Sequence, residues 1–94
     1  METIGFLELN SIAKGIEAAD AMLKAAEVRL IAAPPSCPGK YHLVITGEVA
    51  AVQSSVDAGA AVGAGNVVDQ VVIARVRPQV IEAIGMSTVP ERGN

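Results

Sequence analysis

Hydrophobic and polar positions follow two different periodicities along this chain, and together they predict its secondary structure. Four runs are rich in apolar and β-branched residues, which is typical of strands. These predicted strands are residues 3–9, 28–33, 41–46 and 67–76. Elsewhere apolar residues recur three or four positions apart, which predicts helices over 11–26 and 48–63. Pro78 then opens a short final helix that we expect to end at Ile84.

The same periodicities predict which side chains face the core. On the first helix we expect one apolar face, formed by Ile12, Ile16, Ala19, Leu23 and Ala26. The other face is mainly polar, with Lys14, Glu17, Asp20 and Lys24. The apolar stripe of the second helix is Val49, Val52, Val56 and Ala60. Strand 41–46 directs Tyr41, Leu43 and Ile45 to one side of the sheet and His42, Val44 and Thr46 to the other.

The order of these elements is β-α-β-β-α-β followed by a short helix. Because crossover connections are right-handed, this order predicts an antiparallel sheet with both main helices on one face, the ferredoxin-like arrangement. We therefore expect an α+β sandwich in which residues 1–84 form a single domain and 85–94 a loose tail. The other face of the sheet needs cover from partner subunits or from water.

Composition narrows the class of protein. The chain has 94 residues, 51% of them hydrophobic, yet Phe6 and Tyr41 are its only aromatic residues. Small apolar side chains favour flat, closely approached surfaces, so the apolar excess predicts subunit interfaces. No run reaches the roughly 18 apolar residues of a membrane span, and the N-terminus does not resemble a signal peptide. A net charge of −3 without a basic cluster argues against a nucleic-acid partner.

The one residue with distinctive chemistry lies in the loop between the two central strands. This loop, Pro34-Pro35-Ser36-Cys37-Pro38-Gly39-Lys40, is stiffened by three prolines and carries the chain's only cysteine. A lone cysteine excludes an internal disulfide and fits a reducing cytosol. One thiolate is a poor metal site, since iron–sulfur clusters and structural zinc take about four ligands. If the loop lay at a symmetry axis, several copies of Cys37 would converge on one metal centre.

Other candidate motifs are weak. His42 is the only histidine and has no visible catalytic partner, so a surface or interface role is favoured over that of a general base. Gly59-Ala-Ala-Val-Gly63-Ala-Gly65 falls within and after a helix, so it lacks the geometry of a phosphate loop. These observations indicate a protein that is not an enzyme.

With the loop placed between two β-α-β halves, the chain resembles the bacterial microcompartment shell proteins from about Ile4 to Ile84. The resemblance is carried by Ile-Gly-Phe-Leu-Glu at 4–8, Ile-Glu-Ala-Ala-Asp-Ala-Met-Leu-Lys-Ala-Ala at 16–26, Gly-Glu-Val-Ala-Ala-Val at 47–52 and Asp-Ala-Gly at 57–59. It implies flat cyclic homo-oligomers, usually hexamers, that tile with other shell proteins around a metabolic compartment in the cytoplasm.

The resemblance also implies roles for individual residues. The pore of the oligomer would be lined by Ser36, Cys37, Pro38 and Gly39. Lys24 and Arg75 fall on family positions that contact neighbouring oligomers at the edge. This chain has Glu27 where the family often has Asn, and Val76-Arg77 where it usually has Pro-His. Both departures count against ordinary tiling into sheets.

A Cys-Pro-Gly-Lys pore loop is similar to the branch associated with propanediol-utilisation and glycyl-radical compartments, some members of which bind iron–sulfur clusters at the pore. This similarity implies a 4Fe-4S cluster shared between subunits through Cys37, for electron transfer or cofactor servicing across the shell. Three alternatives stay open: a metal-free pore that passes small metabolites, a ferredoxin-like module that senses a small molecule, and a soluble electron carrier.

Overall fold

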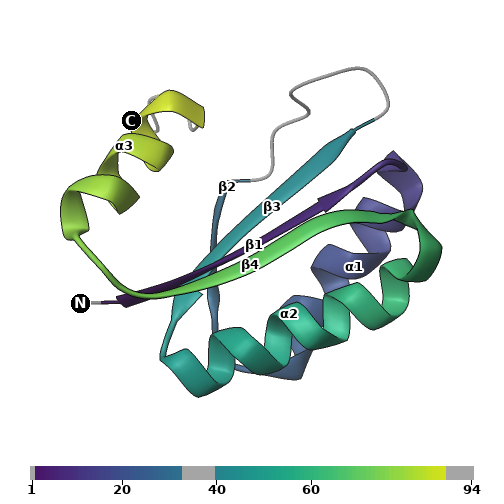
Figure 1. The fold of residues 1–94 in the computed structure, drawn as a ribbon, viewed down its shortest axis with the longest axis horizontal. Coiled ribbons are helices and arrows are strands. Elements are labelled where there is room, and N and C mark those ends of the chain that lie inside the picture. The colour runs from purple at the N-terminus through teal and green to yellow at the C-terminus, as the bar shows by residue number, and fades with distance from the viewer. Residues whose placement is uncertain (1, 33–39, 89–94) are drawn as a thin grey trace.

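Four strands form one antiparallel sheet in the order β2-β3-β1-β4 (Figure 1). The computed structural model describes residues 2–32 and 40–88. The strands are β1 (Glu2–Leu9), β2 (Arg29–Ala32), β3 (Tyr41–Gly47) and β4 (Val67–Val76). The helices are α1 (Ile12–Ala25), α2 (Val49–Gly63), the short 3-10 helix η1 (Ala64–Asn66) and α3 (Pro78–Thr88). Helices α1 and α2 cover one face of the sheet, so the predicted ferredoxin-like α+β fold is confirmed (Figure 1).

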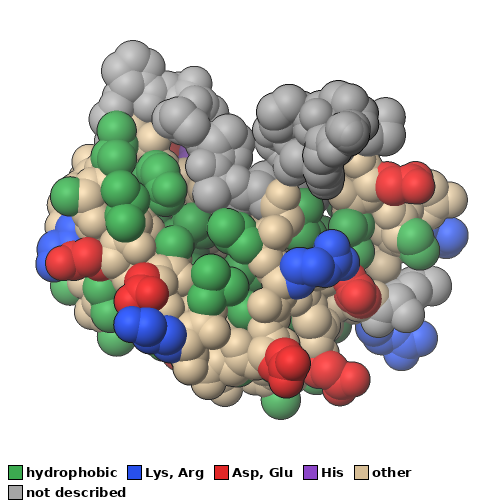
Figure 2. Space-filling view, turned by 180° about the vertical axis from the view of Figure 1, so that it is seen from behind, with side chains coloured by type: hydrophobic (Ala, Val, Ile, Leu, Met, Phe, Trp, Pro, Cys, Tyr) green, Lys and Arg blue, Asp and Glu red, His purple; other side chains and the backbone are tan. Residues whose placement is uncertain are grey.

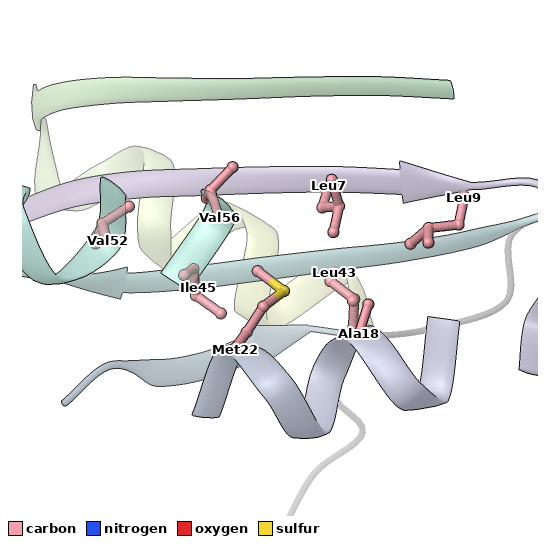
Figure 3. Close-up of a cluster of buried hydrophobic side chains, with 8 residues drawn as sticks. All are labelled: Leu7, Leu9, Ala18, Met22, Leu43, Ile45, Val52 and Val56. Atoms are coloured by element: carbon pink, nitrogen blue, oxygen red, sulfur yellow. The ribbon is translucent and has the colours of Figure 1, made fainter. Parts of the chain in front are cut away.

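The main core lies between this sheet face and the two helices. Leucine and isoleucine side chains of β1 and β3 point toward valines of α2 and toward Ala18 and Met22 of α1 (Figure 3). Burial of this cluster is the main stabilising term for a domain of this size. Its buried members are Leu7, Leu9, Ala18, Met22, Leu43, Ile45, Val52 and Val56.

The predicted buried face of α1 is wrong for its large residues, although Ala19 packs against the main core. The residues of α1 that the fold buries are Gly15, Ala18 and Met22, whereas Ile12, Ile16 and Leu23 are 46%, 58% and 46% exposed. The physical reason is close packing, because small residues let α1 approach the sheet and α2. The stripe of larger apolar residues is rotated by about a quarter turn around the helix axis, so it faces away from the core.

The predictions for α2 and β3 hold better. Val52 and Val56 of α2 are buried as expected, but Val49 at its first position is 55% exposed. In β3, Leu43 and Ile45 face the helices while Val44 belongs to a second cluster on the opposite face, which confirms the predicted alternation.

Helix α3 covers part of the opposite sheet face, where only partner subunits or water were expected (Figure 1). Its Ile81 packs against a small cluster whose members are Ile4, Phe6, Ile31, Val44 and Val76. The helix also ends at Thr88 and not at Ile84, so residues 85–88 of the predicted tail are helical. The remainder of that tail, 89–94, lies outside the described residues.

Candidate functional site

The predicted pore residues Ser36, Cys37, Pro38 and Gly39 lie outside the described residues. The strands on both sides of them are placed, since β2 ends at Ala32 and β3 begins at Tyr41 in an antiparallel pair. Three peptide units separate Cys37 from Lys40, so covalent geometry keeps their Cα atoms within about 11 Å of each other. The surroundings of Lys40, Tyr41 and His42 therefore describe the foot of the cysteine loop.

A charged cluster lies on one face of the sheet at this foot. The Oε2 atom of Glu8 lies 3.6 Å from Nζ of Lys40 and 3.5 Å from Nε2 of His42. The register explains the arrangement, because Glu8 on β1 lies directly opposite His42 on β3. The side chain of Glu8 is only 17% exposed, and the His42 ring also lies 5.5 Å from the ring of Phe6.

Glu8 also has a like-charged neighbour on its other side. Asp69 of β4 lies directly opposite it in the β1–β4 pair. Carboxylates opposite each other in a sheet are destabilising unless cations offset them. Lys40, immediately before β3, supplies such a cation through its contact with Glu8.

Tyr41 lies on the other face of β3, against α1. A Cβ atom placed on Gly15 would lie 2.1 Å from Cδ2 of Tyr41, so the ring rests directly on the helix backbone. Only glycine leaves room for this contact. Tyr41 is partly buried at the margin of the main core.

The predicted edge residue Lys24 lies in the last turn of α1. Its Nζ atom is 2.8 Å from Oδ2 of Asp20, four residues earlier, and its side chain is 75% exposed. The hydrogen bond to Asp20, together with the charge of that carboxylate, raises the pKa of Lys24 above its ordinary value. Lys24 is thus a cation presented at the surface.

The other predicted edge residue, Arg75, lies at a bulge near the end of β4. Its φ of 60° is left-handed, a conformation that costs an ordinary residue about 1 kcal/mol or more. Arg75 borders a surface cavity of about 490 Å³. The cavity is lined by Glu2, Thr3, Glu27, Gly47, Glu48, Val49, Ala74 and Arg75.

The start of β3, which follows the cysteine loop in the chain, and the two edge cations lie at opposite ends of the domain. At one end, Leu9 pairs with Tyr41 beside the loop. At the other end, Glu2 pairs with Val76, next to Arg75. Helix α1 begins near Tyr41 and returns to this far end, where Glu27 lines the same cavity as Arg75. The structure therefore brings Lys24 and Arg75 to one end and separates both from Lys40 and Tyr41, the residues that follow the loop.

Two contributors to this region, Glu8 and Gly15, were not singled out from the sequence. The antiparallel register between β1 and β3 pairs Glu8 with His42, but the sequence alone does not fix that register. Among residues 2–32 and 40–88, no three His, Cys, Asp or Glu side chains are grouped so as to hold a metal ion. Within those ranges, no helix has both the length and the apolar character to cross a membrane.

Comparison with known proteins agrees with this geometry. The sequence matches the family described as BMC domain over residues 3–76. It is 44% identical to the bacterial microcompartment shell protein PduT of Citrobacter freundii over 92 residues, which is 97% of this chain and 50% of that protein. It is 42% identical to the shell protein EutK of Escherichia coli K12 over 77 residues, covering 80% of this chain and 46% of that one.

A solved structure agrees in fold as well. The crystal structure of a microcompartment protein from Desulfitobacterium hafniense DCB superposes with a TM-score of 0.88 at 57% identity. The match covers 97% of this chain and 50% of that one. The chain thus spans about half the length of the first relatives that it matches.

Proposed function

The chain belongs to the BMC-domain family of bacterial microcompartment shell proteins, and from this premise we propose that it is a non-catalytic shell subunit that closes into a ring around its Cys37 loop. One observation carries the proposal: Tyr41, where the chain returns from the loop, is at one end of the domain, and the exposed cations Lys24 and Arg75 are at the other. A ring subunit needs this polarity, since one end faces the axis and the other meets neighbouring rings.

The lateral sides of the domain supply surfaces for ring closure. On the side of α1 and β2, the exposed apolar residues are Ile12, Ile16, Leu23 and Leu30. Seen from behind, hydrophobic side chains gather in patches between oppositely charged ones (Figure 2). On the opposite side, β4 is a sheet edge that exposes Val68, Val71 and Ile73. Because the two sides differ, contact between them is head-to-tail, and such contacts generate a ring when the rotation between neighbouring subunits closes. We propose a homo-oligomeric ring, a hexamer, that tiles with other shell proteins.

The proposed cofactor is a 4Fe-4S cluster held by Cys37 thiolates from several subunits. Thiolate is the donor that iron–sulfur clusters take, and Cys37 is the only cysteine of the chain. Bound there, the cluster would supply one-electron transfer across the shell. A cubane takes about four ligands, so a sixfold ring would use some of its thiols and leave others free. The number of Cys37 thiols that bind the cluster would therefore show whether the ring departs from sixfold symmetry.

Anaerobic purification tests the cluster directly. We expect a brown protein with iron and acid-labile sulfide, an EPR signal after reduction, and loss of all three in Cys37→Ser. Ser54→Ala, an exposed substitution away from the loop, is the control and should keep the colour. A colourless wild-type ring without iron would refute the cluster and leave a metal-free pore for small metabolites.

Size measurement tests the ring separately. A shell subunit should elute as a ring and form sheets or tubes. A dimer or trimer with a ligand cleft would support the rival sensing module. A small oligomer that carries iron but never forms sheets would instead indicate a soluble electron carrier.

The genomic neighbourhood bears on the encapsulated pathway. A neighbouring diol dehydratase or glycyl-radical enzyme would identify it as a propanediol or glycyl-radical pathway.

A further inference from the structure

The surface cavity beside Arg75 carries charges of both signs that are not paired with one another. Glu27, Glu48 and Arg75 all line it, and all three are exposed. Among the described residues none of the three takes part in an ion pair, although they border one cavity of about 490 Å³. The third acid of the cavity, Glu2, differs, since its carboxylate lies 3.6 Å from Arg29. Two carboxylates and one guanidinium group are therefore available to a partner.

Local structure explains these three charges only in part. Glu48 is the N-cap of α2, where a negative charge suits the helix dipole, but its side chain makes no capping hydrogen bond. Glu27 comes directly after the C-cap of α1, where the helix dipole disfavours a carboxylate. Arg75 has a left-handed φ of 60°, which glycine would adopt without strain. The isolated domain thus gains nothing from the charge at two of the three positions.

We propose that this cavity binds a second copy of the chain across a twofold axis, with Arg75 of each copy paired to Glu27 and Glu48 of the other. In a twofold contact the same surface patch meets itself, so a patch with unpaired charges of both signs is complementary to its own copy. The inference deepens the proposed function and rests on it, because sixfold rings that lie in one plane with the same face up meet at twofold axes. The family resemblance places Arg75 at the edge, and the cavity supplies its partners.

A small ion fits the cavity less well than a protein surface does. The guanidinium group of Arg75 would repel a metal cation, and the carboxylates of Glu27 and Glu48 would repel an anion. Within the part of the chain that the structure describes, no three His, Cys, Asp or Glu side chains are grouped to hold a metal. A surface that itself carries both signs satisfies all three residues, and the same end of a second copy is such a surface.

An arginine also suits this pairing better than the nearby lysine. The planar guanidinium group offers five donors and can bind two carboxylates at once, whereas a lysine acts as a point charge. Lys24 lies at the same end of the domain, but its Nζ atom is already 2.8 Å from a carboxylate oxygen of Asp20. Arg75 has no such partner among the described residues, so it is the cation that a second copy would meet.

The contact should decide tiling without deciding the stability of the ring. A single exposed ion pair contributes little, but a twofold contact contains it twice and a ring repeats the contact at every edge. Salt should weaken such pairs, because the screening length falls from about 10 Å at 0.1 M to about 3 Å at 1 M ionic strength. We therefore expect wild-type sheets to disperse into intact rings over this range of salt.

Charge reversal in the full-length protein tests the pairing. Arg75→Glu makes the available charges of the cavity all negative, and Glu27→Arg combined with Glu48→Arg makes them all positive. Both single-sign variants should keep the ring and the melting temperature but lose sheets in negative-stain microscopy. The fully swapped variant, with all three substitutions, should form sheets again, because each cation once more meets carboxylates. Glu82→Arg reverses an exposed carboxylate of α3 outside this cavity and should keep the sheets.

The two single-sign variants also show whether the partner is a second copy. Mixed in equal amounts, they should scatter more light than either alone, because rings of opposite charge can then meet at their edges. Unchanged sheets in either single-sign variant would overturn the contact, and so would a fully swapped variant that forms rings but no sheets. If a reversed variant does not fold, Arg75→Gln and Glu27→Gln with Glu48→Gln decide the question, since both must lose sheets at lower salt than wild type.

The mass of the wild-type protein tests the proposed function separately. A wild-type protein smaller than a ring would refute the ring but not the contact. The contact would then appear as a dimer, which both single-sign variants lose and the fully swapped variant regains. A wild-type ring whose sheets resist both salt and charge reversal would refute the contact alone.

Discussion

The side-chain hydroxyl of Ser55 in α2 donates a 2.8 Å hydrogen bond to the backbone carbonyl of Met22 in α1, and both residues are buried. Met22 lies in the last turn of α1, where carbonyl groups have no partner within the helix. Ser55 of α2 therefore supplies the hydrogen-bond donor for a carbonyl group at the end of α1. The bond fixes where α1 stops beside α2, and so where Lys24 is presented.

Ser55→Ala should destabilise the fold. The substitution removes the donor and leaves the Met22 carbonyl buried without a partner, which costs about 1–3 kcal/mol. At about 4–8 °C per kcal/mol for a domain of this length, the melting temperature should fall by several degrees. Ser54→Ala changes the exposed neighbour and should leave it unchanged. Both variants must be compared at one protein concentration, because ring formation also stabilises the fold. Equal melting temperatures would show that the bond contributes nothing.

The periodicity of α1 predicted an apolar helix but identified the wrong face as buried. The helix carries two adjacent apolar stripes, one of large residues that includes Ile16 and one of small residues around Ala18. If the larger apolar residues are assumed to be buried, the first stripe is predicted to face the core. The fold buries the second, because Gly59 of α2 approaches Met22 so closely that a Cβ there would lie 2.6 Å from its side chain. The close packing of α1 against α2 depends on contacts between residues far apart in the chain, so it cannot be predicted from the periodicity of α1.

The outward stripe of α1 yields a prediction for assembly. Ile16 is 58% exposed in the single domain, so Ile16→Glu should change the free energy of folding little, by about 0.5 kcal/mol or less. If the stripe closes the ring, the buried charge should reduce the protein to smaller species in light scattering. Ala13→Glu places the same charge on the polar stripe of Glu17 and Asp20, and should keep the ring. An unchanged mass for Ile16→Glu would place the ring contact elsewhere.

The candidate site was predictable only in part. The chemistry of its side chain singled out Cys37, whereas Lys24 and Arg75 were singled out only by the resemblance to the shell-protein family. The partners of His42 and Tyr41 depend on register between strands and on helix packing, both set by contacts distant in sequence. The left-handed backbone of Arg75 was also unpredictable, since nothing in an arginine indicates that conformation.

Lys24 should support sheet formation over a wide pH range. The ion pair with Asp20 raises the pKa of Lys24 above its ordinary value, so the cation is fully present at neutral pH. It is lost only as the pH rises through that raised pKa, above about 10.5. Negative-stain microscopy should therefore show sheets from about pH 6 to 9 for wild type and none for Lys24→Ala. Lys14→Ala, which removes another paired lysine of α1, is the control that should retain them. Loss of sheets in both variants would indicate a general charge effect.

Arg75 combines an edge cation with a strained backbone, and two substitutions separate these roles. At φ 60°, Ala keeps the left-handed strain, whereas Gly adopts this conformation freely. Arg75→Gly should therefore be about 1 kcal/mol more stable than Arg75→Ala in urea unfolding. Both lose the guanidinium group and should lose sheet formation equally, because the edge contact needs the side chain. Sheets that persist in Arg75→Gly but not in Arg75→Ala would instead mean that the bulge geometry, and not the cation, makes the edge competent for tiling.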